Sequence, residues 1–125
     1  MESKKVIIPF KFLKADLLKY HVPLREKEHD LHNTRIVLVA ILKPVCSLVN
    51  NRVYSMRVEK IERATHYRII LCVEEAFLLT EEKDSLLRSQ LNCLNKWQLV
   101  FEQVNAGDDN FLHINVQRIE SYNIL

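Results

Sequence analysis

Hydrophobic and polar residues alternate along four segments of the chain, and this pattern predicts four half-buried strands. Residues 54–58 and 66–74 carry the alternation in the middle of the chain, and residues 97–104 and 111–122 carry it near the end. A period of two places hydrophobic side chains on one face of a sheet and polar side chains on the other. We therefore expect two hairpins, the first with its turn at residues 62–65.

A fifth strand is expected from a run that does not alternate. Arg35–Pro44 reads RIVLVAILKP, which is almost entirely aliphatic and rich in β-branched residues. A continuous apolar run of this length is typical of a strand that is buried on both faces. The run predicts the first strand of the fold, at its core.

Other segments show the spacing of helices. Leu13 and Leu17 follow Pro9 at a spacing of four residues, which predicts a short N-terminal helix. The clearest helix is Thr80–Lys96, because its first residue can cap an acidic first turn and leucines recur along one side. Residues 21–33 are charged and polar, and we interpret them as a solvated connector or a loose helical turn.

The predicted order of these elements favours one fold. Five strands with the helix Thr80–Lys96 between the third and the fourth match the five-stranded Greek-key barrel of the OB type. The chain would be all-β with one or two helices, residues 1–34 forming an N-terminal arm and connector and residues 35–125 the barrel. An α+β open sheet and an SH3-like barrel are the alternatives, and the helix argues against the second.

Composition limits the class of protein. The chain has 125 residues, 48% hydrophobic and 27% charged, which suits one folded domain. No stretch of the sequence reaches the roughly 18 consecutive apolar residues of a membrane span. Lys11 and Lys14 interrupt the N-terminal apolar run, whereas the apolar region of a signal peptide is uninterrupted. Three cysteines without metal-site spacing predict free thiols in a reducing compartment. We expect a soluble intracellular protein without a bound metal.

Catalytic patterns are missing from the sequence. Gly107 is the single glycine, so the glycine-rich loops that hold nucleotide phosphates are excluded. Adjacent carboxylates such as Glu74 and Glu75 do not face each other, and His66 and Cys72 would lie about 20 Å apart on one strand. We therefore expect no enzyme and no cofactor. A small enzyme whose site is assembled from distant residues stays open as an alternative.

Charge is unevenly distributed along the chain. Residues 35–68 carry seven Lys and Arg against two Glu, a net charge of +5, whereas residues 69–125 carry a net charge of −5. In OB domains the second and third strands bind single-stranded nucleic acid by phosphate neutralisation and base stacking. The basic region covers these predicted strands, although Asp108 and Asp109 in the last turn would repel phosphate. The candidate nucleic-acid contacts are Arg52, Arg57, Lys60, Arg63 and Arg68.

The helix Thr80–Lys96 carries more leucines than one narrow buried stripe requires. Part of this helix is therefore expected to meet a partner subunit. The candidate partner-interface residues are Leu86, Leu87, Leu91 and Leu94.

The size, the predicted element order and the ending FLHINVQRIESYNIL resemble the smallest OB-fold subunit of the CST telomere-capping complex, which is similar in form to the small subunit of replication protein A. The resemblance covers roughly Arg35 to Tyr122 and lies in the layout. The chain departs from that pattern in two respects: the first predicted strand has no glycine, and too few residues follow Tyr122 for a long C-terminal helix.

The resemblance implies a small accessory subunit of a telomeric complex that binds single-stranded DNA. Such a subunit would lie in the nucleus, form a heterodimer with a larger OB-fold protein, and act mainly by stabilising that partner. A general protein-interaction barrel without nucleic-acid contact is the alternative.

Overall fold

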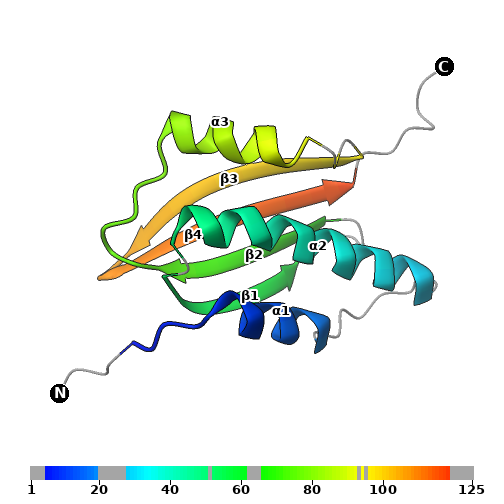
Figure 1. Ribbon diagram of the computed structural model, residues 1–125, viewed down its shortest axis with the longest axis horizontal. Helices are drawn as coiled ribbons and strands as arrows, with labels where there is room; N and C mark the ends of the chain where they lie inside the picture. The colour runs from blue at the N-terminus through cyan, green and yellow to red at the C-terminus, as the bar shows by residue number, and fades with distance from the viewer. Residues whose placement is uncertain are drawn as a thin grey trace.

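Three helices and four strands make up the regular structure of the part of the chain that the computed structural model describes, residues 5–19, 28–50, 52–61, 66–92, 94 and 96–118 (Figure 1). The helices are α1 (Phe10–Lys19), α2 (Glu28–Leu48) and α3 (Glu81–Gln90). The strands are β1 (Val53–Lys60), β2 (His66–Val73), β3 (Trp97–Ala106) and β4 (Asp109–Arg118).

The four strands form one open antiparallel sheet in the order β1-β2-β4-β3. Both predicted hairpins are confirmed, because β1 pairs with β2 and β3 pairs with β4. The turn of the second hairpin holds Gly107 at φ 63°, a backbone conformation that glycine adopts without a steric cost. Residues 62–65, the predicted turn of the first hairpin, lie outside the described residues.

The fifth predicted strand is a helix. Arg35–Pro44 lies within α2, so the described residues form an open sheet of four strands and not a closed barrel of five. The buried positions of α2 recur at helical spacing, and every position between them is at least partly exposed. These buried positions are Thr34, Leu38, Ile41, Leu42, Val45 and Cys46, and Val49 continues the pattern directly after the helix.

The extent of α2 bears on two further expectations, one for residues 21–33 and one for the boundary between the N-terminal region and the barrel. Residues 28–33 belong to this helix, which agrees with the helical alternative for residues 21–33 and not with a solvated connector, whereas residues 20–27 lie outside the described residues. The expected boundary between an arm and a barrel, at residues 34 and 35, falls inside the same helix.

The two helices predicted from leucine spacing are present. α1 begins directly after Pro9, as expected, and the carbonyl of Pro9 accepts the backbone N–H of Phe12 at 3.0 Å. α3 begins after its N-cap Thr80, whose hydroxyl accepts the backbone N–H of Lys83 at 3.2 Å, but it ends at Gln90, before the predicted Lys96. Along the chain, α3 lies between β2 and β3.

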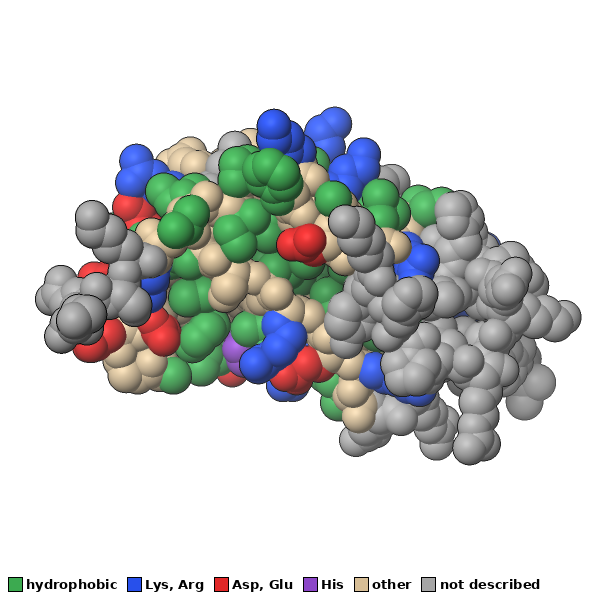
Figure 2. Space-filling view, turned by 90° about the horizontal axis from the view of Figure 1, so that it is seen from below, with side chains coloured by type: hydrophobic (Ala, Val, Ile, Leu, Met, Phe, Trp, Pro, Cys, Tyr) green, Lys and Arg blue, Asp and Glu red, His purple; other side chains and the backbone are tan. Residues whose placement is uncertain are grey.

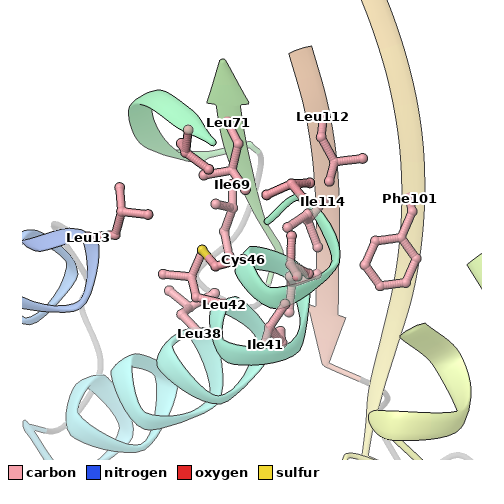
Figure 3. Packing of buried hydrophobic residues seen from close by; sticks show 14 of the residues in the cluster. Leu13, Leu38, Ile41, Leu42, Cys46, Ile69, Leu71, Phe101, Leu112 and Ile114 are labelled. Carbon is pink, nitrogen blue, oxygen red and sulfur yellow. The ribbon is translucent and has the colours of Figure 1, made fainter. Parts of the chain in front are cut away.

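One hydrophobic core joins the helices to a single face of the sheet. α2 lies across the sheet in Figure 1, and Figure 3 shows Leu38, Leu42 and Cys46 of this helix among side chains from β2, β4 and β3. Leu13 of α1 enters the same cluster from the side of β1. Each fully buried aliphatic side chain contributes about 1.5–3 kcal/mol. All three helices therefore depend on the same sheet face.

Polar contacts fix the chain at one end of the sheet, where β2 ends and β4 begins. Asn110 is almost fully buried, and its amide donates to the carbonyls of Glu74 and Phe77 at 3.0 and 2.9 Å. Gln103 donates to the same Phe77 carbonyl at 2.9 Å and accepts from the backbone N–H of Leu79 at 2.8 Å. These bonds satisfy buried polar groups and attach the loop before α3 to the second hairpin.

The segment 5–9, to which the word arm refers from here on, contacts the start of β1. The backbone N–H of Ile8 donates to the carbonyl of Val53 at 2.7 Å. Lys5 forms an ion pair with Asp109 and lies over the ring of Tyr54, 5.2 Å from its centroid. The arm therefore links the β1 edge to the start of β4.

Candidate functional site

The sheet has a second face, turned away from the helices, which we call the open face. Side chains alternate between the two faces along each strand, so the register of the strands assigns its members. No helix among the described residues covers this face, and Arg57, Val100 and Glu102 on it are exposed. The open face consists of Ser55, Arg57, Glu59, His66, Arg68, Ile70, Cys72, Gln98, Val100, Glu102, Val104, Phe111, His113, Asn115 and Gln117.

Opposite charges lie in two neighbouring rows across the open face. One row, from β3 to β1, contains Glu102, His113, Ile70 and Arg57, and the next contains Val100, Asn115, Arg68 and Glu59. Two arginines and two glutamates balance each other there. The face therefore attracts phosphate much less than the basic region of the sequence suggests.

Two aromatic rings lie on β4 near the middle of this face. Phe111 and His113 are both half-buried, with ring centroids 6.4 Å apart and planes at 61°, an edge-to-face arrangement. Partial burial lowers the pKa of His113 below 6.5, and the positive charge of Arg68 lowers it further, while Glu102 opposes this shift. These effects favour the neutral form of the His113 ring, which lies beside the phenyl ring.

The two arginines of the open face are held differently. Nε of the half-buried Arg68 donates to Oδ1 of Asn115, its cross-strand neighbour, at 2.9 Å. Arg57 is more exposed and forms an ion pair with Glu59 at 3.0 Å. Exposed pairs of this kind contribute at most about 1 kcal/mol, so an anionic ligand can compete for Arg57.

Beside Arg68 the open face is hollowed. The hollow has a volume of about 240 Å³ and is open to solvent. Val100 contributes the apolar part of the lining, and the other lining residues carry amide or imidazole groups. The lining consists of His66, Gln98, Val100, Asn115 and Gln117.

The structure brings two of the five predicted nucleic-acid residues together. Arg57 and Arg68 lie in adjacent rows of the open face. Arg52 precedes β1 and forms an ion pair with Glu74, away from these rows. Lys60 shares the helix-side face of β1 with Val58, and Arg63 lies outside the described residues.

The predicted leucine interface on α3 is largely part of the core. Leu87 is fully buried and Leu91 is 5% exposed, because both pack against the sheet of their own chain. Leu94 is half-buried in the same cluster. Leu86, 47% exposed, is the one of the four leucines that faces solvent.

Sequence reasoning missed the aromatic pair and the amide-lined hollow. His113, Asn115 and Gln117 alternate with hydrophobic residues in the predicted last strand and were assigned only to its polar side. Phe111 precedes them at the same parity, and an aromatic residue on a polar strand face was the signal available. The strand order, which places β4 beside β2, could not be inferred from alternation alone.

A second surface is apolar and lies on the helix α1 and the arm. Val6 is 73% exposed, and Ile7 and Phe12 are each about half exposed. Figure 2 views the molecule from the side on which α1 and β1 lie in Figure 1, and shows hydrophobic side chains gathered over this side with Lys and Arg along one rim. Exposed apolar patches with a polar rim are typical of protein-interaction surfaces.

The buried thiols are poor nucleophiles. Cys46 lies in the core, and burial raises the pKa of its thiol to about 11. Burial also raises the pKa of Cys72 on the open face. Thiolate is the reactive form, so neither cysteine resembles an activated nucleophile.

Among the described residues, no group of three or more His, Cys, Asp or Glu residues is placed to hold a metal ion. Nor is any described helix long and apolar enough to cross a membrane. Comparisons of the chain with protein-family models, with curated proteins and with solved structures gave no match.

Proposed function

We propose that the protein is a small accessory subunit that contacts single-stranded nucleic acid through the open face of its sheet and works beside a protein partner. The observation that carries the proposal is the aromatic pair Phe111–His113 on a central strand, uncovered by any described helix. A four-stranded sheet whose exposed aromatic side chains stack on bases is an established way to bind unpaired strands.

Stacking would supply most of the affinity. A base stacked on an aromatic side chain contributes about 1–3 kcal/mol, whatever its identity. The neutral His113 ring suits this role, because it stacks without adding a charge that salt would screen. Two rings together contribute about 2–6 kcal/mol, which corresponds to dissociation constants from tens of millimolar to tens of micromolar, weak for a protein that acts alone and sufficient for an accessory subunit.

The arginines would position the backbone of the strand. Arg57 and Arg68 lie on the β1 and β2 side of the aromatic pair, Arg57 in the row of His113 and Arg68 in the next row, so both would contact phosphates along one side of a stacked strand. Each phosphate contact with a single strand contributes about −0.7 to the slope of log affinity against log salt, so two contacts give about −1.4. Glu59 and Glu102 limit the attraction to these two contacts.

The setting of the proposal comes from the resemblance described above. It places the subunit at telomeres in the nucleus, in a heterodimer with a larger OB-fold protein. The layout behind that resemblance included a strand at Arg35–Pro44, where the structure has a helix, so of the predicted strand layout the two hairpins are retained. The exposed apolar side chains of the arm and α1 are the surface we assign to the partner. Co-purification from native cells, followed by identification of what elutes with the chain, tests this part.

Titration of a labelled single-stranded oligonucleotide at several salt concentrations tests nucleic-acid binding. We expect Phe111→Leu to weaken binding about tenfold with little change in salt slope, because it removes stacking and no charge. Arg57→Gln should reduce the slope by about 0.7. Lys43→Ala, which removes an exposed cation from α2 on the other side of the sheet, is the matched control and should change neither quantity. Absence of binding by the chain, alone and with its partner, would reject the nucleic-acid role.

A protein-binding role without nucleic acid is the second candidate. It is favoured by the balance of charges on the open face, where the ion pair Arg57–Glu59 already engages one arginine. In that case Phe111→Leu would weaken partner binding, and no oligonucleotide would bind at any salt concentration.

A further inference from the structure

The hollow on the open face lies next to the aromatic pair along the same strand. Asn115, which lines the hollow, follows His113 by two residues on β4, a separation of about 7 Å at strand rise. In a duplex the nucleotides of one strand are ~3.4 Å apart along the axis, and an unpaired strand can extend further, so no more than two nucleotides are needed to span this distance. A strand stacked on Phe111 and His113 therefore reaches the hollow with a nearby base.

The lining of the hollow suits the edge of a nucleobase. Gln98 and Gln117 face each other across β3 and β4, and each amide can both donate and accept hydrogen bonds. Asn115 uses Oδ1 to accept from Arg68, which fixes the orientation of its amide and leaves its N–H groups to donate. Val100, 44% exposed, offers an apolar contact beside these groups.

We propose that this hollow is a subsite for one unpaired nucleobase, read by hydrogen bonds from Gln98, Asn115 and Gln117. The proposal deepens the function above and rests on it: the aromatic pair provides affinity for any base, and the hollow provides preference between bases. Each donor or acceptor that a wrong base leaves unpaired has a cost, which is the physical origin of such preference.

The test measures, by fluorescence anisotropy, the affinity of the full chain for oligonucleotides of about ten residues of dT, dA or dC. An abasic backbone of the same charge is measured in the same way. For the wild-type chain we expect about a tenfold difference between the best and the weakest base, and the weakest binding with the abasic backbone. The double variant Gln98→Ala/Gln117→Ala should bind all three oligonucleotides with similar affinity, close to the affinity of the wild-type chain for the base that it binds most weakly. Both glutamines are exposed, so the variant should keep the circular dichroism spectrum and unfolding midpoint of the wild type.

Gln90→Ala, which truncates an exposed glutamine on α3, is the matched control and should keep the base preference. Equal affinity of the wild-type chain for all three bases, or an unchanged preference in the double variant, would overturn the subsite while leaving binding by the open face intact. No binding of any oligonucleotide would overturn the subsite together with the proposed function.

Discussion

His113 shows how the open face controls the charge of one residue. Its pKa is lowered by partial burial and by Arg68, so the folded protein binds this proton less readily than the unfolded chain does. The resulting stability is fully present above the unfolded pKa of about 6.5 and is lost as the pH falls below it. At the scale of a single residue, the imidazole is thus kept neutral by its neighbours.

We expect His113→Gln to remove this pH dependence. Urea unfolding of the wild type and the variant at about pH 7.5 and 5.5 is the measurement, because few carboxylates titrate between these values. The free energy of unfolding should fall more in the wild type than in the variant as the solution is acidified. Equal decreases in the two proteins would contradict the lowered pKa.

Cys46 gives a second residue-scale prediction. With its thiol in the core and its pKa raised to about 11, it should resist alkylation by iodoacetamide in the native protein at pH 8. It should react readily once the chain is unfolded. Peptide mapping by mass spectrometry assigns the label to each cysteine, and rapid native labelling at this position would refute its burial.

At the scale of elements, α3 depends on its first turn. The hydroxyl of Thr80 satisfies the backbone N–H of Lys83, and the first turn carries three carboxylates that suit the positive end of the helix dipole. Thr80→Ala should lower the free energy of unfolding by about 1 kcal/mol, and Thr80→Ser should restore most of it. Denaturant titration measures both changes. Two equal losses would mean that the hydroxyl does not cap the helix.

α2 explains why the sequence predicted part of the fold and not the rest. Alternation identified all four strands, because polar and hydrophobic residues point to opposite faces along most of each strand, although Ile70 and Cys72 on the open face of β2 are buried as well. Arg35–Pro44 was misread because β-branched residues favour strands and a continuous apolar run of this length also suits a strand that is buried on both faces. Over the longer window from Thr34 to Val49 the buried positions have helical spacing, and packing against the sheet outweighs local propensity.

The candidate site was predictable to a similar extent. Arg57 and Arg68 were identified from charge, and alternation assigned both to a wet face. Their separation from Arg52 depends on register and ion pairing, which no local pattern encodes. Leu87 and Leu91 were predicted as core residues and also named as interface candidates, because the number of leucines does not reveal how deeply a helix packs, and both are buried.

At the scale of the whole molecule, one core joins all the elements. Leu13 and Leu17 of α1 are fully buried in the same cluster as the sheet, so the N-terminal region is part of the folding unit. A fragment of residues 35–125 should therefore lack a cooperative unfolding transition, whereas residues 5–125, which keep α1, should unfold like the full chain. Circular dichroism and limited proteolysis distinguish the two. A stably folded shorter fragment would show that the N-terminal region is dispensable.

The strict division of the sheet into a helix-side face and an open face limits which changes in length the second hairpin can tolerate. Inserting one residue within β4 would turn Leu112, Ile114 and Val116 toward solvent and carry their polar neighbours into the core. Inserting two would restore the parity and move the aromatic pair along the strand without changing its face. Natural variants of this hairpin should therefore differ in strand length by even numbers, with odd changes confined to the turn around Gly107.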